Sequence, residues 1–179
     1  MLKLTSKNYY SQEANQAYWS ASFIKSMMDC PARTIAELEG KYFRPATVSL
    51  LIGSYVDSYF EGTLEQFKGN HPELFKRDGT LKAEYLRAND MIRRAEQDPV
   101  FMEYTRGEKQ VILTGEIEGL PFKAKLDIYQ RGKRIVDLKT VKDMEPMYRP
   151  GQGKLSFAEY GLSKWLFTKQ WKAIGSHVI

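Results

Sequence analysis

Two neighbouring stretches of the sequence decide the fold, FKAKLDIY at residues 122–129 and IVDLKTVKD at residues 135–143. Apolar and polar residues alternate in the first, and the second opens on two β-branched apolar residues, which is typical of strands. A short basic turn separates them, as in a hairpin. With a further stretch upstream that is rich in β-forming residues, they predict a three-stranded antiparallel meander over residues 109–117, 120–130 and 134–140.

Two acids and a lysine lie near the ends of these predicted strands. Asp127 is near the end of one strand and Asp137 near the end of the next, so their side chains are expected to lie side by side. Asp137 and Lys139 are separated by one residue, and the period of two in a strand puts both on one face. Leu138 between them is expected to point into the core.

A hard cation such as Mg²⁺ would explain the two acids, because oxygen ligands suit it and unpaired like charges repel. A bound cation can lower the pKa of a water molecule and stabilise charge on a scissile phosphate, while Lys139 orients the water or contacts the phosphate. The alternative is an exposed strand whose charges form only cross-strand ion pairs. An isolated D-x-K pattern does not decide between the metal site and the ion pairs. Charged side chains at the end of a buried strand, however, cost free energy unless they have a functional role or are paired with opposite charges.

Helices are predicted on both sides of the meander. One buried helix covers residues 47–60, with Gly53 at a place where backbones can approach closely. Glu61 at its end is a candidate third ligand, and Asp57 lies one turn earlier on the same face. A solvated helix-end glutamate is the alternative for Glu61. Other helices are expected to begin at Ser20 or Ser22, to run from Pro31 to Gly40, and to cover 81–97 and 155–174, with a loop at 143–153.

The composition indicates an ordinary globular protein. With 179 residues, 42% of them hydrophobic and 27% charged, we expect a single domain over residues 1–179. It divides into a mainly helical part at 1–106, the meander at 107–142 and a helix at 155–174. The single cysteine, Cys30, excludes an intramolecular disulfide and a multi-cysteine metal site. No apolar run reaches membrane length, so a cytoplasmic protein without a membrane partner is expected.

Positive charge is concentrated around the predicted site. The formal net charge is +5, and the segment from Pro121 to Lys142 holds seven basic residues but only two acids. Such a segment permits a polyanionic partner. The residues expected to contact DNA phosphates are Lys123, Lys125, Arg131, Lys133 and Arg134.

The combined pattern resembles the PD-(D/E)XK nuclease superfamily, in particular its phage and prophage RecE-like and lambda-exonuclease-like members. The resemblance rests on FKAKLDIY and IVDLKTVKD. It also rests on NYYS at 8–11, YWSASF at 18–23, CPA at 30–32 and GSYVDSYFE at 53–61. It implies an α/β (α+β) fold with a restriction-endonuclease-like core, N-terminal helices, a central mixed sheet containing the antiparallel meander, and a C-terminal helix.

The resemblance also implies an active site. Mg²⁺ or Mn²⁺ would be held by the acids that match the family's ligands, Glu61, Asp127 and Asp137. The backbone carbonyl of Leu138 matches a further ligand position, Asp57 is an additional candidate ligand, and Lys139 matches the catalytic lysine. The implied activity is a metal-dependent DNA exonuclease that acts on duplex ends in phage-type recombination or DNA end processing. A bacterial or phage-infected host cytoplasm, a single-strand annealing protein as partner and a homo-oligomer follow by the same analogy.

Two departures from the family pattern leave a second function open. Asp57 stands where related sequences usually have histidine in G-x-x-x-H-x-x-x-E, and it cannot reproduce imidazole chemistry. The last predicted helix has no clear match to the family's glutamine, and the sequence ends soon after it. The alternative is a catalytically inactive nuclease-fold module that binds DNA or another protein.

Overall fold

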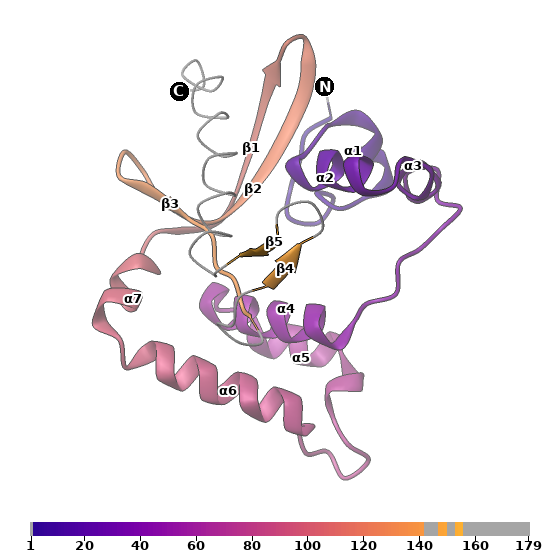
Figure 1. Ribbon diagram of the computed structural model, residues 1–179. Coiled ribbons are helices and arrows are strands. Elements are labelled where there is room, and N and C mark those ends of the chain that lie inside the picture. The colour runs from indigo at the N-terminus through magenta and orange to yellow at the C-terminus, as the bar shows by residue number, and fades with distance from the viewer. Residues whose placement is uncertain (1, 142–146, 150–152, 156–179) are drawn as a thin grey trace. The chain divides into compact units, whose positions relative to one another are not determined.

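The computed structural model describes residues 2–141, 147–149 and 153–155 (Figure 1). Contacts divide the chain into two compact units, residues 1–140 and 141–179. The helices described in the first unit are α1 (Gln12–Ala17), α2 (Ala21–Asp29), α3 (Pro31–Leu38), α4 (Val48–Glu61), α5 (Leu64–Asn70), α6 (Ala83–Glu96) and α7 (Pro99–Tyr104), with a 3₁₀ turn at Pro72–Leu74. Its strands are β1 (Glu108–Ile117), β2 (Leu120–Gln130) and β3 (Arg134–Val136).

The helices begin where the sequence provides caps. The Ser20 hydroxyl accepts a hydrogen bond from the Phe23 amide and starts α2, and Thr47 does the same for Leu50 at the start of α4. Pro31 occupies the first turn of α3, where its missing N–H costs nothing. Three helices were not predicted, α1, α5 and α7, because stretches of six or seven residues are too short for a periodic pattern.

The hydrophobic core lies mainly between α4 and α6. Its buried members are Tyr55, Val56, Leu74, Tyr85, Ala88 and Ile92. The Tyr55 hydroxyl donates a 2.9 Å hydrogen bond to Asn89 Oδ1, so the buried phenol keeps a polar partner. Leu138 packs against this cluster, as predicted. The helix at 47–60 was predicted to be buried, but Leu50 in the first turn of α4 is 58% exposed.

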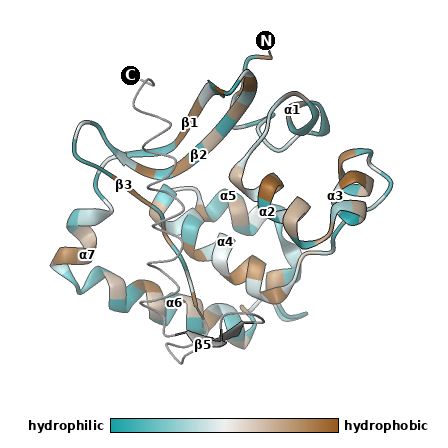
Figure 2. Ribbon diagram, turned by 45° about the horizontal axis from the view of Figure 1, so that its top comes forward, coloured by the Kyte–Doolittle hydropathy of each residue, from teal (hydrophilic) through white to brown (hydrophobic). Residues whose placement is uncertain are grey.

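The sheet is an antiparallel meander in the order β1-β2-β3, which confirms the predicted mixed α and β fold. Hydrophobic and hydrophilic residues alternate along β2 (Figure 2), whereas β1 holds three consecutive apolar residues from Val111 to Leu113. Glu118 and Gly119 connect these strands with φ angles of 49° and 76°, the positive values that two-residue hairpins need. Trp19 adds a parallel bridge to Phe122 in β2, so the sheet also carries a short parallel contact.

The third strand is shorter than predicted. It ends at Val136 instead of Thr140, so Asp137 and Lys139 follow the strand and do not lie within it. The reason is a side chain, since Asp127 Oδ2 accepts the Leu138 amide at 2.9 Å, directly beyond the last strand pair, Ile128 with Val136. The carboxylate therefore takes the place of the strand ladder at this point.

The second unit contributes a two-stranded antiparallel hairpin, β4 (Met147–Arg149) and β5 (Gly153–Leu155). The prediction of a continuous loop at 143–153 was therefore wrong at residues 147–149 and at Gly153. The two prolines and two glycines of this segment suggested a loop, but they do not prevent two strands of three residues each. Leu155 belongs to β5 and does not begin a helix. The rest of the helix expected at 155–174 lies outside the described residues.

Gly107 is a position where only glycine fits, and replacing it should destabilise the sheet. Its φ is 137°, and a Cβ atom there would lie 2.7 Å from the carbonyl oxygen of Tyr129. We expect Gly107→Ala to lower the free energy of unfolding by about 1–3 kcal/mol. Gly69→Ala is the matched control, because Gly69 lies in a helix with nothing within 4 Å of the added atom. Urea unfolding of both variants measures the difference, and equal midpoints would contradict the expectation.

Candidate functional site

A small acidic pocket lies where residues of α4 meet the first two strands. Three of the residues that line it are partly buried carboxylates, two from α4 and one from β2. The lining residues are Asp57, Phe60, Glu61, Lys109, Gln110, Asp127, Ile128 and Leu138. The pocket therefore joins the two parts of the chain in which acids were predicted to be functional.

Asp127 is the central acid of this pocket. Its Oδ2 atom accepts the Leu138 amide at 2.9 Å and lies 3.9 Å from the Lys139 ammonium nitrogen. Burial raises the pKa of Asp127, and the neighbouring Asp137 raises it further, whereas the Leu138 amide and Lys139 act in the opposite direction. The Asp127 side chain thus links β2 to residues 137–139, the segment that carries the D-x-K pattern.

Lys139 lies near both Asp137 of that pattern and Asp127 of β2. Its Nζ atom donates to Asp137 Oδ1 at 2.6 Å and to the Leu138 carbonyl at 3.0 Å. Asp137 does not line the pocket, and its side chain is 65% exposed. The predicted proximity of Asp127, Asp137 and Lys139 is therefore present, although the strand that was expected to impose it has already ended.

Asp57 and Glu61 face the pocket from successive turns of α4. Burial and the nearby charge of Asp127 raise the pKa of Asp57 to about 6. Burial also raises the pKa of Glu61, while Lys125 and a hydrogen bond from Thr63 lower it. The raised pKa values mean that nearby positive charges and hydrogen-bond donors do not fully stabilise the ionised forms of these carboxylates.

A close contact holds α4 against the D-x-K segment. A Cβ atom added to Gly53 would lie 3.3 Å from the Thr140 hydroxyl oxygen, so a larger residue in the middle of α4 would press on Thr140. The close approach predicted at Gly53 was one between backbones, but the neighbour found there is the Thr140 side chain. The contact brings α4, which carries two of the pocket carboxylates, next to the segment that carries Lys139.

The donor atoms of this site suit a hard divalent cation. The acids offer only oxygen, and a positive ion would relieve the repulsion that raises their pKa values. In the conformation seen, however, no three histidine, cysteine, aspartate or glutamate side chains of the described residues approach closely enough to hold one ion. Lys139 also occupies both Asp137 Oδ1 and the Leu138 carbonyl. The chemistry of the donors fits a metal, but the side chains are not arranged around one.

Two pocket residues were missed by the sequence reasoning, Lys109 and Gln110. Gln110, near the start of β1, has a φ of 53° and lies opposite Asp127, between the strand pairs Lys109 with Ile128 and Val111 with Leu126. No sequence signal marks this backbone conformation, which costs free energy in a residue other than glycine. Burial lowers the pKa of Lys109, and Glu61 acts against that effect.

Lys123 was predicted to contact DNA, and the structure contradicts this. The residue is only 3% exposed, and its ammonium group donates to the Tyr9 carbonyl at 2.6 Å and to Asn15 Oδ1 at 2.7 Å. The N-terminal segment thus covers Lys123 and accepts two of the three hydrogen bonds that its ammonium group can donate. Nothing in the local sequence distinguishes it from Lys125, which stays partly exposed.

The other predicted DNA-contacting residues lie at the β2–β3 turn. Arg131 and Lys133 are exposed and lie 3.7 Å and 3.5 Å from Glu108 and Glu103, respectively. The guanidinium carbon of Arg134 lies 4.2 Å from the centre of the Tyr104 ring. These residues make a basic turn whose described contacts are with α7 and the start of β1, and their role toward DNA stays a prediction.

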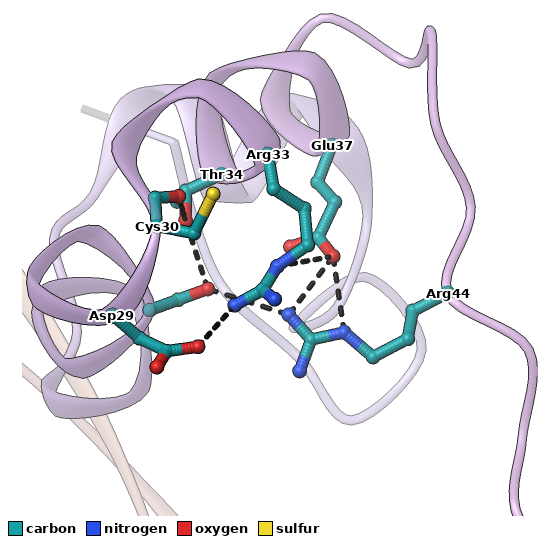
Figure 3. Close-up of polar contacts among 7 residues, drawn as sticks. Asp29, Cys30, Arg33, Thr34, Glu37 and Arg44 are labelled. Carbon is teal, nitrogen blue, oxygen red and sulfur yellow. Dashed lines mark hydrogen bonds and ion pairs between the residues drawn. The ribbon is translucent and has the colours of Figure 1, made fainter.

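A second polar cluster lies at the corner between α2 and α3 (Figure 3). Arg33 pairs with Asp29 at 2.5 Å, and Arg44 pairs with Glu37 at 2.9 Å. Both arginines thus have acidic partners of their own, so the cluster fastens the extended segment after α3 to these helices. We assign it a structural role.

Within the part of the chain that the structure describes, no helix is both long enough and apolar enough to cross a membrane.

Comparisons with known proteins agree on the fold. A family model described as a PDDEXK-like domain of unknown function (DUF3799) matches residues 20–160. Among solved structures, the chain is similar to a protein from Eubacterium rectale named "putative exonuclease", at 40% sequence identity and a TM-score of 0.86. That similarity covers 98% of this chain and 68% of the other. A comparison with curated proteins found no match.

Proposed function

The chain belongs to the family of PDDEXK-like domains designated DUF3799, and on this premise we propose that it is a metal-dependent DNA exonuclease. The observation that carries the proposal is the position of Asp127. It contacts the Leu138 amide and approaches Lys139 at the pocket that Asp57 and Glu61 share. The exonuclease name of the similar protein from Eubacterium rectale supports the same activity.

Glu61, Asp127 and Asp137 would hold the cation, with the Leu138 carbonyl and Asp57 as further oxygen donors. PD-(D/E)XK nucleases generally use divalent ions, and Mg²⁺ or Mn²⁺ fits a site of carboxylates and carbonyls. When bound, the ion supplies a Lewis acid that lowers the pKa of a water molecule and offsets negative charge on the phosphate.

Other residues of the chain would stabilise the phosphate, exclude water and bind the DNA strand. Lys139 places a positive charge 3.9 Å from Asp127 Oδ2, where it would stabilise charge developing on a phosphate oxygen or orient the attacking water. Phe60, Ile128 and Leu138 form the apolar part of the pocket and limit the access of bulk water. Lys125, two residues before Asp127, would contact a phosphate of the bound strand.

The finer features of the proposal concern the substrate and its context. The activity would act on duplex DNA ends and serve phage-type recombination or DNA end processing, with a single-strand annealing protein as partner. A homo-oligomer is part of the same proposal, since ring-shaped relatives occur among the nucleases that the sequence resembles.

The central test compares linear and closed circular duplex DNA in Mg²⁺, Mn²⁺ and EDTA, for the wild type, Lys139→Ala and Lys76→Ala. We expect metal-dependent loss of the linear substrate only, absent in Lys139→Ala and unchanged in Lys76→Ala. Lys76 is the matched control, because it is an exposed lysine in a turn outside the pocket. Cleavage that persists in EDTA, or equal rates for all three proteins, would contradict the proposal.

One observation favours a second function, a catalytically inactive module that binds DNA or protein. Among the described residues no three acids gather around one point, and Lys139 occupies two of the proposed ligand atoms. This module would bind DNA with a strong dependence on salt, because contacts with phosphates release counterions. Salt-sensitive binding with no cleavage in either metal would favour it.

A further inference from the structure

One face of β2 leads directly to the acidic pocket. Lys123, Lys125 and Asp127 occupy alternate positions and therefore share this face. The N-terminal segment covers the first two. Lys123 Nζ lies 4.7 Å from the centre of the Tyr9 ring, and Lys125 Nζ lies 5.1 Å from the centre of the Tyr10 ring. The next position on the face is Asp127, which lines the pocket, so Tyr10 contacts the lysine that precedes the pocket on this face.

Several contacts fix the N-terminal segment in this place. The Trp19 amide donates to the Pro121 carbonyl and the Lys123 amide donates to the Trp19 carbonyl, both at 2.8 Å. The buried Lys123 ammonium holds the Tyr9 carbonyl at 2.6 Å. Tyr10 therefore follows a residue that is tied to β2 by a buried charged hydrogen bond.

The ring of Tyr10 is nevertheless free on most of its surface. The residue is 71% exposed, and its described aromatic contact is an edge-to-face contact with Tyr9 at 4.9 Å between ring centres. The pKa of Tyr10 is raised by partial burial around its hydroxyl group and then by the negative charges of Asp127, Glu61 and Asp57. The hydroxyl end thus lies near the acids, while ring surface remains open to solvent.

We propose that Tyr10 and Lys125 form a nucleotide-binding subsite beside the acidic pocket, in which the Tyr10 ring stacks on an unpaired base at a DNA end. Lys125 contacts the phosphate that joins this nucleotide to the next. An aromatic ring can stack only on a base whose face is exposed, as in single strands and frayed ends. The subsite therefore selects DNA whose terminal nucleotide is unpaired. This inference rests on the proposed function, because it takes nucleic acid as the ligand.

The test measures equilibrium binding in EDTA, where metal-dependent cleavage cannot consume the DNA. Fluorescently labelled single-stranded and blunt duplex oligonucleotides are titrated with the wild type, Tyr10→Phe, Tyr10→Ala and Tyr42→Ala. Tyr42 is the matched control, a tyrosine 43% exposed in the segment that follows α3. Thermal unfolding of each variant verifies the fold, and Tyr10→Ala should retain it because the side chain is mostly exposed.

We expect Tyr10→Ala to weaken the binding of the single strand about tenfold, since stacking of one base contributes roughly this much or more. Tyr10→Phe should stay within about twofold of the wild type, and Tyr42→Ala should be unchanged. The loss should be smaller on the blunt duplex. Equal binding by Tyr10→Ala and the wild type, an equal loss in Tyr10→Phe, or an equal loss in Tyr42→Ala would overturn the subsite.

Cleavage assays of the same proteins separate this inference from the nuclease proposal. Tyr10-dependent binding without cleavage by the wild type in Mg²⁺ or Mn²⁺ supports the subsite and removes the enzymatic activity. Cleavage by the wild type with no effect of Tyr10→Ala on binding supports the nuclease and overturns the subsite. A wild type that binds neither oligonucleotide in EDTA and cleaves neither in Mg²⁺ or Mn²⁺ overturns both.

Discussion

Replacing Asp127 by asparagine should lower the rate of DNA cleavage by about a thousandfold while leaving the fold intact. The side chain keeps its size, and an amide oxygen can still accept the Leu138 N–H, which Asp127 Oδ2 now accepts at 2.9 Å. What is lost is the negative charge that would hold a cation in the pocket. A thousandfold loss corresponds to about 4 kcal/mol of transition-state stabilisation, within the range that a bound metal provides. Initial rates on linear duplex DNA in Mg²⁺ measure the effect.

The matched control is Asp90→Asn, which removes an exposed carboxylate of α6 that pairs with Arg93. It should leave the rate unchanged, because this acid lies outside the pocket. Thermal unfolding in EDTA shows whether Asp127→Asn is folded. A folded Asp127→Asn variant that retains more than about a tenth of the wild-type rate would mean that this carboxylate is not a metal ligand.

Local features of the fold could be predicted from the sequence because neighbouring residues determine them. Ser20 and Thr47 cap the helices that follow them, and Glu118-Gly119 closes the first hairpin. The alternating pattern of FKAKLDIY placed β2 correctly, and its match to PD-(D/E)XK proteins is confirmed by the family comparison. In each case the deciding residues lie within a few positions of the element that they define.

Features that depend on distant contacts could not be predicted. Lys123 and Lys125 look alike in the sequence, yet Lys123 is buried by Tyr9 and Asn15, more than 100 residues earlier. The end of β3 depends on one side-chain hydrogen bond, from the Leu138 amide to Asp127. The positive φ of Gln110 opposite Asp127 likewise follows from the tertiary structure and not from residue type.

The candidate site shows the same division. The spacing of Asp127, Asp137 and Lys139 predicted their proximity. In the structure this proximity depends on the hydrogen bond from the Leu138 amide to the Asp127 carboxylate, and not on a continuous strand. Their catalytic roles stay predictions. The sequence also placed Asp57 and Glu61 on one helix face, but it could not show how much the pocket perturbs each acid. That depends on how deeply each is buried beside Asp127.

Asp57 is the acid whose charge should cost the folded protein most free energy in the absence of metal. Its pKa is raised to about 6 in the folded state from an ordinary value of 3.8. Above pH 6 the side chain is charged in both the folded and the unfolded protein, and the folded state bears the cost of burial and of repulsion from Asp127. As the pH falls through 6, the folded state takes up a proton that the unfolded state does not yet bind. The free energy of unfolding therefore gains a contribution from Asp57 on acidification, and loses it as the pH rises.

Asp57→Asn should accordingly stabilise the protein in EDTA at pH 8 and have little effect at pH 4. With allowance for the partial solvent exposure of the side chain, we expect a gain of about 1–2 kcal/mol in the free energy of unfolding at the higher pH. Urea unfolding of variant and wild type between pH 4 and pH 8 measures this difference, and Asp90→Asn again provides an exposed control. In saturating Mg²⁺ the order should reverse, because the wild type gains the binding free energy of an ion that its extra carboxylate helps to hold. A difference that does not change with pH would mean that the pocket does not perturb Asp57, and an unchanged order in Mg²⁺ would remove Asp57 from the ligand set.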